Sequence, residues 1–309
     1  CDIDYGKINI YAGNYEFWYE ASQLAQKQRK DQNRRAEDKI EELKSFIRRF
    51  ASNASKAKQA TSRKKLLDKM TVEEMPASSR KFPWVNFKME REPGKIVLEI
   101  NDLTLDGGEV GELKGLNFSL GNQDKVALVG EFDTLKSAFF ETISGEVEPK
   151  KGNIKWGTTI NYNYFPRNND KFFDIDLSLV DWLRQYSEEQ DETFIRGFLG
   201  RMLFTGEEAL KSAKVLSGGE KVRCMLSRMM LSNANTLLLD EPTSHLDLES
   251  ITALNNGLKA YAGPIIFCTQ DHEFAQTVAN RILELTPTGY VDRTISFDEW
   301  LESKKGKKK

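Results

Sequence analysis

The feature that most constrains the fold of this chain is a pair of short segments about twenty residues apart. The first, Leu216-Ser217-Gly218-Gly219-Glu220, places a hydroxyl and two unobstructed backbone amides where a helix is expected to begin. The first N–H groups of a helix have no internal partner and carry positive partial charge, so this segment predicts an anion site. The second, Leu237-Leu238-Leu239-Asp240-Glu241-Pro242, is an apolar strand that ends in two adjacent carboxylates. One carboxylate can hold Mg²⁺ through water while the other orients an attacking water.

A phosphate-binding loop would be expected directly after another apolar strand. The octapeptide Gly130-Glu131-Phe132-Asp133-Thr134-Leu135-Lys136-Ser137 directly follows Val126–Val129. Its frame matches the P-loop pattern G-x-x-x-x-G-K-[ST] at three positions. These are Gly130, Lys136 and Ser137. We interpret the segment as an altered P-loop, and an ordinary strand-to-helix turn is the alternative.

One residue of this loop departs from the pattern, and a second adds an unfavourable charge. Leu135 replaces the second glycine, where backbone amides must approach phosphate closely at dihedrals that a Cβ disfavours. If the ordinary loop geometry is kept, Leu135 should cost about 1–2 kcal/mol. Asp133 adds a carboxylate that is unfavourable beside polyphosphate unless it is neutralised.

Composition places the chain among globular proteins. Its 309 residues are 39% hydrophobic and 30% charged, enough for one large domain with an accessory element. The longest apolar runs are far shorter than the roughly 20 residues that span a bilayer, so no membrane segment is expected. Cys1, Cys224 and Cys268 form no C-x-x-C pair, which predicts structural thiols in a reducing cytoplasm. Because position 1 is Cys rather than Met, we expect the chain to be a fragment.

The spacing of breakers and apolar residues predicts a long helix followed by an α/β domain. From Phe17 to Ala51 no Pro or Gly interrupts a helical pattern, and an apolar seam repeats at three-four-three spacing. A second helix reaching Met70 would complete an antiparallel hairpin. Beyond it, short strands and helices alternate to the C-terminus. The expected organisation is a tail over 1–16, the hairpin over 17–75, a connector over 76–95, an α/β domain over 96–303 and a lysine tail over 304–309.

The near-neutral net charge hides a split between the hairpin and the rest. From Lys27 to Lys69 the chain holds fifteen Lys and Arg against six Asp and Glu, whereas the remaining residues are acidic overall. A neutral spacer would mix signs, so this surplus favours contact with a polyanion such as RNA. A solvated spacer between domains is the alternative. The cations expected at the tip are Lys56, Lys58, Arg63, Lys64 and Lys65.

Three passages together resemble the soluble ABC-F proteins, which carry two ATP-binding cassettes joined by a linker. Asp2–Ile8 with Tyr11–Tyr15 resembles the end of a first cassette, and the basic hairpin resembles the linker, which in the family reaches the ribosome. Val215–Lys221 and Leu239–Asp247 resemble the signature, the Walker B strand and the D-loop of the second cassette. The D-loop residues are Ser244, His245, Leu246 and Asp247.

This resemblance implies an α/β fold, namely a P-loop NTPase cassette with a mixed sheet, flanking helices and a helical subdomain, preceded by a basic α-helical hairpin. It implies ATP and Mg²⁺ as ligands, with Ser137 and Asp240 at the metal and Lys136 at the phosphates. Glu241 would orient water. The implied partners are the first cassette of the same protein and the ribosome, with its rRNA and tRNA, and no membrane.

Three departures from the family pattern bear on the mechanism. Gln270 stands where the family has its switch histidine, and His272 lies two residues beyond. Arg167 stands where a glutamine is expected after Tyr164-Phe165. No aromatic residue occurs in Leu105–Gly108, where one usually stacks on adenine. The signature, by contrast, matches throughout. This asymmetry predicts that the chain completes a working site on the first cassette and that its own site hydrolyses ATP poorly.

The leading hypothesis is therefore an ATP-driven translation factor in which cassette closure sets the hairpin angle. Two alternatives remain open. One is a ribosome- or RNA-binding module that does not hydrolyse ATP. The other is the ATPase subunit of a membrane transporter, which the basic hairpin disfavours. A normally functioning altered P-loop is the alternative to the asymmetric pair.

Overall fold

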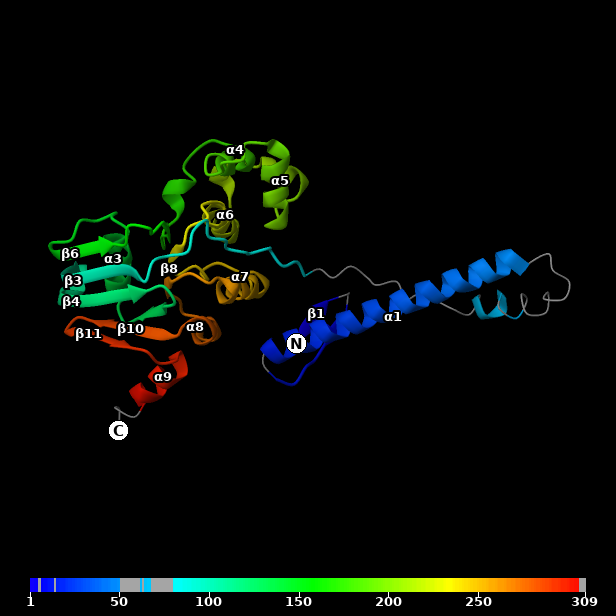
Figure 1. Ribbon diagram of the computed structural model, residues 1–309, viewed down its shortest axis with the longest axis horizontal. Helices are drawn as coiled ribbons and strands as arrows, with labels where there is room; N and C mark the ends of the chain where they lie inside the picture. Colours follow the sequence, from blue (N-terminus) through cyan, green and yellow to red (C-terminus); the bar gives the residue numbers. More distant parts are fainter. Residues whose placement is uncertain (5–6, 14, 51–61, 63, 68–79, 306–309) are drawn as a thin grey trace. The chain divides into compact units, whose positions relative to one another are not determined.

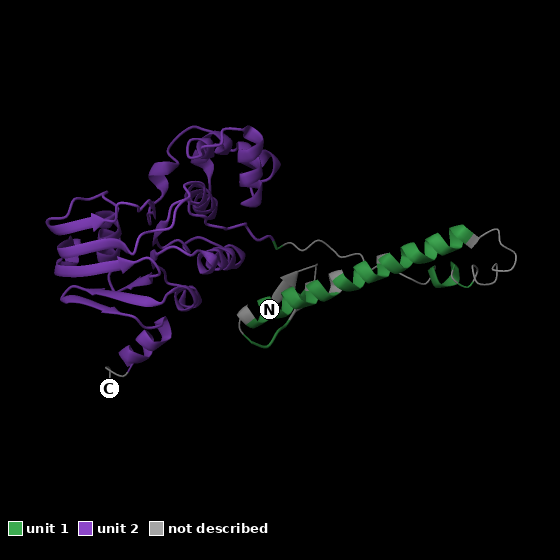
Figure 2. Cartoon of the chain, in the orientation of Figure 1, with its two compact units in different colours: residues 1–80 green, residues 81–309 purple. Residues whose placement is uncertain are grey.

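The structure is a computed structural model that describes residues 1–4, 7–13, 15–50, 62, 64–67 and 80–305. The chain divides into two compact units, residues 1–80 and 81–309, which Figure 2 shows in different colours. The finer division expected at residues 16, 75 and 95 stays a prediction.

The first unit contains a small strand pair and one long helix (Figure 1). Strands β1 (Asp2–Asp4) and β2 (Lys7–Asn9) pair antiparallel. Helix α1 (Tyr15–Phe50) spans 36 residues, as the uninterrupted pattern predicts. Within its apolar seam Leu43 is buried, and the ring of Trp18 lies under the guanidinium of Arg80 at 4.2 Å. Most of the expected second helix, including Lys56, Lys58 and Arg63, lies outside the described residues, so the hairpin stays a prediction.

The second unit is built on a six-stranded sheet in the order β11-β10-β5-β9-β8-β7. All neighbours are parallel except β10 and β11, which are antiparallel. Parallel strands end at the same edge of a sheet, and open α/β sheets bind ligands in the crevice outside these ends. The ends of β5, β9 and β8 lie side by side and mark the position of this crevice. The strands are β5 (Lys125–Val129), β7 (Tyr162–Phe165), β8 (Thr236–Asp240), β9 (Ile265–Cys268), β10 (Arg281–Thr286) and β11 (Gly289–Arg293).

A second, three-stranded antiparallel sheet in the order β4-β3-β6 packs over one face of the first, with helix α3 (Asp133–Ile143) between them. Side chains alternate across β5: Val126 and Leu128 point into this layer, whereas Ala127 points into the opposite core. The apolar strand is therefore buried on both faces. The strands of the second sheet are β3 (Ile96–Asp106), β4 (Glu112–Gly121) and β6 (Lys151–Trp156).

Helices cover the other face of the large sheet and extend into a helical subdomain. In that subdomain the fully buried Trp182 donates from Nε1 to the carbonyl of Phe172 at 2.7 Å. The helices are α4 (Leu179–Arg184), α5 (Glu192–Arg201), α6 (Gly218–Leu231), α7 (Leu248–Ala260), α8 (His272–Val278) and α9 (Phe297–Lys305). Single 3₁₀ turns lie at Gly108–Val110, Asp170–Phe172, Gly206–Leu210 and Ala213–Val215.

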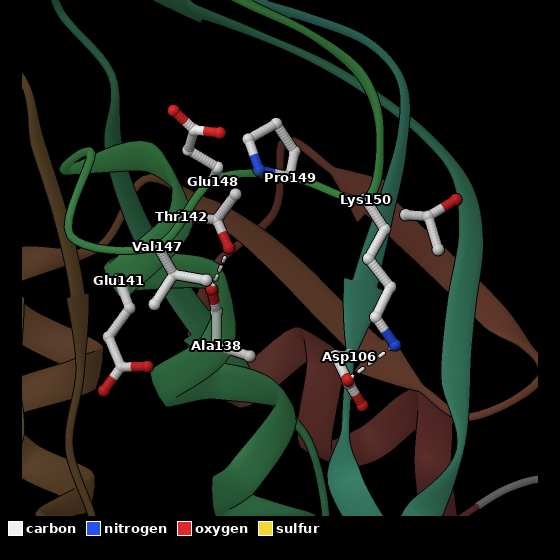
Figure 3. A pocket seen from close by; sticks show the side chains of 9 residues that line it. Asp106, Ala138, Glu141, Thr142, Val147, Glu148, Pro149 and Lys150 are labelled. Carbon is white, nitrogen blue, oxygen red and sulfur yellow. Dashed lines mark hydrogen bonds and ion pairs between the residues drawn. The ribbon is translucent and has the colours of Figure 1, made fainter.

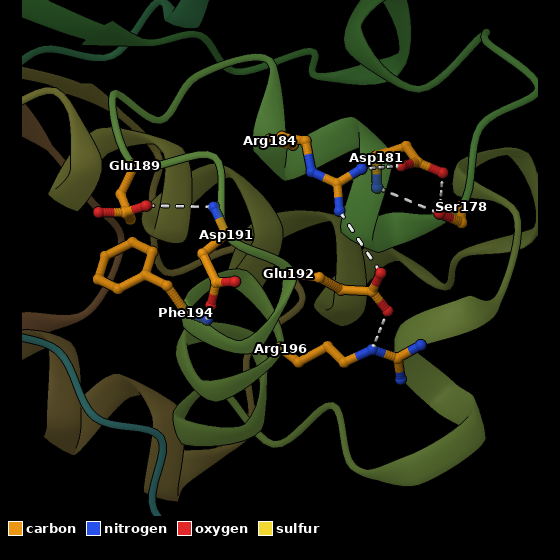
Figure 4. Close-up of polar contacts among 8 residues, drawn as sticks. All are labelled: Ser178, Asp181, Arg184, Glu189, Asp191, Glu192, Phe194 and Arg196. Atoms are coloured by element: carbon orange, nitrogen blue, oxygen red, sulfur yellow. Dashed lines mark hydrogen bonds and ion pairs between the residues drawn. The ribbon is translucent and has the colours of Figure 1, made fainter.

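Ion pairs on the surface connect α4 and α5 (Figure 4). Arg184 lies between Asp181 of its own helix and Glu192 of α5, and Glu192 also accepts from Arg196 at 2.6 Å. These side chains are partly exposed, so each pair contributes on the order of 0–1 kcal/mol and the buried core fixes the two helices.

Candidate functional site

The crevice at the strand ends brings together Ser137 of α3 and Asp240 of β8. The Ser137 hydroxyl donates to Oδ2 of Asp240 at 2.8 Å, and the thiol of Cys268 donates to Oδ1 at 3.0 Å. Asp240 is fully buried, and burial raises its pKa although both hydrogen bonds oppose this. A hydroxyl oxygen and a carboxylate oxygen side by side are the kind of metal ligands that Mg²⁺ prefers. The predicted metal residues therefore fit the ion.

Glu241 combines two unusual features at one position. Its backbone lies in the left-handed region with φ of 54°, and its amide donates to the carbonyl of Cys268 at 3.2 Å. The side chain is only 3% exposed, and its Oε1 has no hydrogen-bond partner among the described residues. Burial raises the pKa of this carboxyl. Backbone strain and an orphaned buried oxygen both point to a functional rather than a structural residue.

The altered P-loop departs from ordinary loop geometry. Gly130 passes so close to the carbonyl oxygen of Leu285 that a Cβ would lie 2.5 Å from it, which explains the glycine. Helix α3 begins at Asp133, so Leu135 lies in its first turn with its side chain fully buried against Gly107. The strain expected at Leu135 does not arise, because a helical residue has negative φ. The Leu135 side chain belongs to the core and does not line the phosphate site of the P-loop.

Lys136 of the loop and Arg167 outside it contact the same carboxylate. Lys136 Nζ lies 2.7 Å from Oδ1 of Asp133, and Arg167, just after β7, lies 2.6 Å from Oδ2. The Arg167 guanidinium and then the Lys136 ammonium lower the pKa of Asp133 to about 2. From the sequence, this carboxylate is expected to be unfavourable beside polyphosphate unless it is neutralised. In the structure Lys136 and Arg167 neutralise it, one at each oxygen. Neither Asp133 nor Cys268 is predicted as a site residue from the sequence. For Asp133, its charge within the P-loop could have indicated a role in the site.

The switch segment follows β9. Gln270 is exposed, and Thr269 beside it shares a hydrogen bond with Thr243 at 2.7 Å between their hydroxyls. His272 contacts Asp298 at 2.8 Å, with both side chains half-exposed. His272 therefore lies on the α9 side of the segment, and the assignment of the switch position to Gln270 rather than His272 stays a prediction.

The signature and the D-loop contact each other. Ser217 caps α6 by accepting from the amide of Glu220, whose carboxylate accepts in turn from the Ser217 amide at 2.8 Å. A Cβ on Gly218 would lie 3.0 Å from the His245 ring, and one on Gly219 would lie 2.8 Å from the His245 carbonyl oxygen. Both glycines therefore permit His245, which has φ of 66°, to pack against the helix start. Of the other motif residues, Leu216 is buried, Leu246 is half-buried, Ser244 and Asp247 are exposed, and Asp247 caps α7.

A cavity of about 250 Å³ lies between β3, α3 and the segment 147–150 (Figure 3). Its lining includes the carboxylates of Asp106, Glu141 and Glu148 against the single ammonium of Lys150, which pairs with Asp106 at 2.7 Å. An acidic lining disfavours polyphosphate. This cavity is therefore distinct in chemistry from the crevice that holds Lys136.

Comparison with known proteins shows that the chain is similar to ABC transporter ATP-binding proteins. Two family models, both described as ABC transporter, match residues 1–87 and 113–244. An uncharacterized ABC transporter ATP-binding protein of Bacillus subtilis, YkpA, is 55% identical over 100% of this chain and 58% of its own length. ABC transporter F family member 5 of Arabidopsis thaliana is 27% identical over 97% of this chain and 44% of its own length. The chain thus spans about half the length of these relatives.

A solved structure supports the fold. The chain of cbiO1 from Clostridium perfringens, described as part of the ABC transporter complex cbiONQ, matches with a TM-score of 0.52 and 18% identity. The match covers 70% of this chain and 94% of that chain. The predicted α/β cassette fold is confirmed. In the described part of the chain, no helix combines the length and the apolar character needed to cross a bilayer.

Proposed function

Because this chain carries an ATP-binding cassette of the ABC transporter class, we propose that it is part of an ABC-F protein that binds Mg-ATP between two cassettes. The sequence similarity to a protein named as an ABC transporter F family member supports this proposal. So does the match of residues 1–87 to a separate ABC family model ahead of the cassette.

One observation carries the proposal: the signature keeps its full pattern, whereas the cassette's own phosphate site does not. The helix start at Ser217 is capped and its glycines are closely packed. In the P-loop, by contrast, Asp133 lies between Lys136 and Arg167. We infer that the signature completes an ATP site on the preceding cassette of the same polypeptide. The cassette's own site then binds nucleotide and hydrolyses it poorly.

Each residue of the cassette's own site has a role under this proposal. Ser137 and Asp240 hold Mg²⁺, and Lys136 contacts the phosphates. The buried carboxylate of Glu241 orients an attacking water. Gln270 can hydrogen-bond a phosphate oxygen but cannot carry positive charge, so it stabilises developing negative charge less than a protonated histidine would.

Substitutions in the full-length protein test the asymmetry. Ser217→Arg should abolish most ATP hydrolysis, because its bulk blocks the shared site. Ser217→Ala is the matched control, since it loses the helix cap, at about 1 kcal/mol, without adding bulk. Lys136→Gln, in the altered site, should change total hydrolysis much less than Ser217→Arg does. Equally mild effects of Ser217→Arg and Lys136→Gln on the hydrolysis rate would contradict the asymmetric assignment.

We further propose that the basic linker couples ATP binding to the ribosome in the cytoplasm, contacting rRNA or tRNA. Its surplus of cations suits RNA phosphates, and Lys64 and Lys65 are exposed. The ionic contact within the P-loop favours one alternative, a ribosome- or RNA-binding module in which neither site turns over. Wild-type ribosome binding without any measurable hydrolysis by the full-length protein would select that alternative.

A further inference from the structure

We propose that Asp133 determines which ligands the cassette's own site accepts, because its carboxylate competes with phosphate for Lys136 and Arg167. This inference rests on the proposal that the site takes nucleotide. In P-loops the lysine reaches the β- and γ-phosphates of the ligand. In this chain the same ammonium already has an anionic partner from its own helix.

The contact is held from two separate elements. Asp133 and Lys136 lie one turn apart at the start of α3, whereas Arg167 follows β7 and approaches from the far side of the carboxylate. The Lys136 side chain is only 10% exposed, so it has little freedom to turn to water instead. Asp133 and Arg167 are 42% and 38% exposed, which leaves both accessible to a ligand.

Charge decides what can displace Asp133. Both cations already contact the carboxylate of Asp133. A ligand that displaces this carboxylate must therefore offer more negative charge than it does at the same place. A nucleoside triphosphate does so with its β- and γ-phosphates, whereas a nucleoside monophosphate has no group that reaches Lys136. After displacement the carboxylate remains nearby and repels the phosphates. Asp133 therefore weakens triphosphate binding and leaves monophosphate binding unchanged.

The test measures nucleotide binding by the purified chain, with isothermal titration calorimetry in Mg²⁺. Asp133→Asn keeps the side-chain size and removes the charge. Because the carboxylate then no longer competes for the two cations or repels the phosphates, the affinity for ATP should rise about tenfold. The affinity for AMP should stay within about twofold. Unfolding by urea checks that the variant folds, and the change should stay small because the ion pairs are partly exposed.

Two controls isolate the mechanism. Glu131→Gln removes the same charge from an exposed residue of the same loop, and the ATP affinity should change much less. In the double variant Asp133→Asn, Lys136→Gln the gain should be lost, because the released ammonium is gone. Unchanged or weaker ATP binding by Asp133→Asn, or an equal gain from Glu131→Gln, would overturn the inference. Hydrolysis by the full-length protein tests the proposed function separately, since that activity depends on Ser217.

Discussion

The thiol of Cys268 and the carboxylate of Asp240 form a buried hydrogen bond of 3.0 Å between the ends of two neighbouring strands. Burial and then the charge of Asp240 hold the pKa of the thiol well above its ordinary value, so the sulfur stays protonated and donates. Ser137 donates to the other oxygen of the same carboxylate. Cys268 thus positions the residue that we assign to Mg²⁺.

We expect Cys268→Val to destabilise the cassette by about 1–3 kcal/mol at neutral pH, because a buried carboxylate oxygen loses its donor. Cys268→Ser keeps a donor and should lose less. Cys224→Val is the matched control, since this fully buried thiol lies in the other apolar core. Urea unfolding measures the differences. Equal losses for Cys268→Val and Cys224→Val would show that the bond to Asp240 contributes nothing.

Stability should depend on pH through Glu241. Burial raises the pKa of this carboxyl in the folded state, so its ionised form destabilises the fold at neutral pH. That cost disappears as pH falls through the folded pKa toward the unfolded value. We therefore expect Glu241→Gln to be more stable than wild type at pH 7–8, by on the order of 1 kcal/mol, with the difference shrinking toward pH 5.

Glu220→Gln is a control whose stability should change in the opposite direction to that of Glu241→Gln. The same urea unfolding measures it. Burial alone would raise the pKa of Glu220, but hydrogen bonds from Ser217 and the ammonium of Lys211 hold it below its ordinary value. Its ionised form therefore stabilises the fold, and Glu220→Gln should be less stable than wild type at pH 7. A pH-independent difference for Glu241→Gln would show that its carboxyl does not titrate with a raised pKa.

The contact between the signature and the D-loop predicts a steric effect at Gly219. Gly219→Ala should cost about 1–3 kcal/mol, since the new methyl group meets the backbone oxygen of His245. Gly200→Ala, in α5, meets nothing within 4 Å and should be neutral or stabilising by about 0.5–1 kcal/mol. Thermal unfolding compares the two variants. A fully tolerated Gly219→Ala would mean that the D-loop can move away from the helix start.

The linker predicts salt-dependent RNA binding. Replacing five cations by Gln should weaken ribosome association and flatten its salt dependence, by roughly one unit of slope for each lost phosphate contact. The helix should persist, because Gln is nearly as good a helix former as Lys. Ribosome pelleting at increasing salt measures the slope. The residues are Lys56, Lys58, Arg63, Lys64 and Lys65.

A matched variant separates position from net charge. It replaces five exposed lysines of the cassette unit by Gln, and its ribosome binding should keep the wild-type slope. An unchanged slope in the linker variant, with intact circular dichroism, would make the linker a spacer only. The control residues are Lys81, Lys88, Lys95, Lys155 and Lys259.

The sequence by itself determined the local elements of this protein and the edge where they meet. Periodicity predicts α1, and apolar runs predict β5 and β8, because side-chain direction repeats every 3.6 residues in a helix and every two in a strand. The rule that parallel strands end together then places Gly130, Asp240 and Gln270 near one crevice.

Only the tertiary structure decided which side chains meet there. Asp133 and Arg167 are 34 positions apart, and Asp240 and Cys268 are 28 apart, so no local pattern relates them. Spacing alone assigned Leu135 to the phosphate loop. Because α3 already begins at Asp133, the Leu135 side chain lies in the core instead. Such pairings depend on packing and on side-chain direction across neighbouring strands, and those are properties of the assembled sheet rather than of any segment.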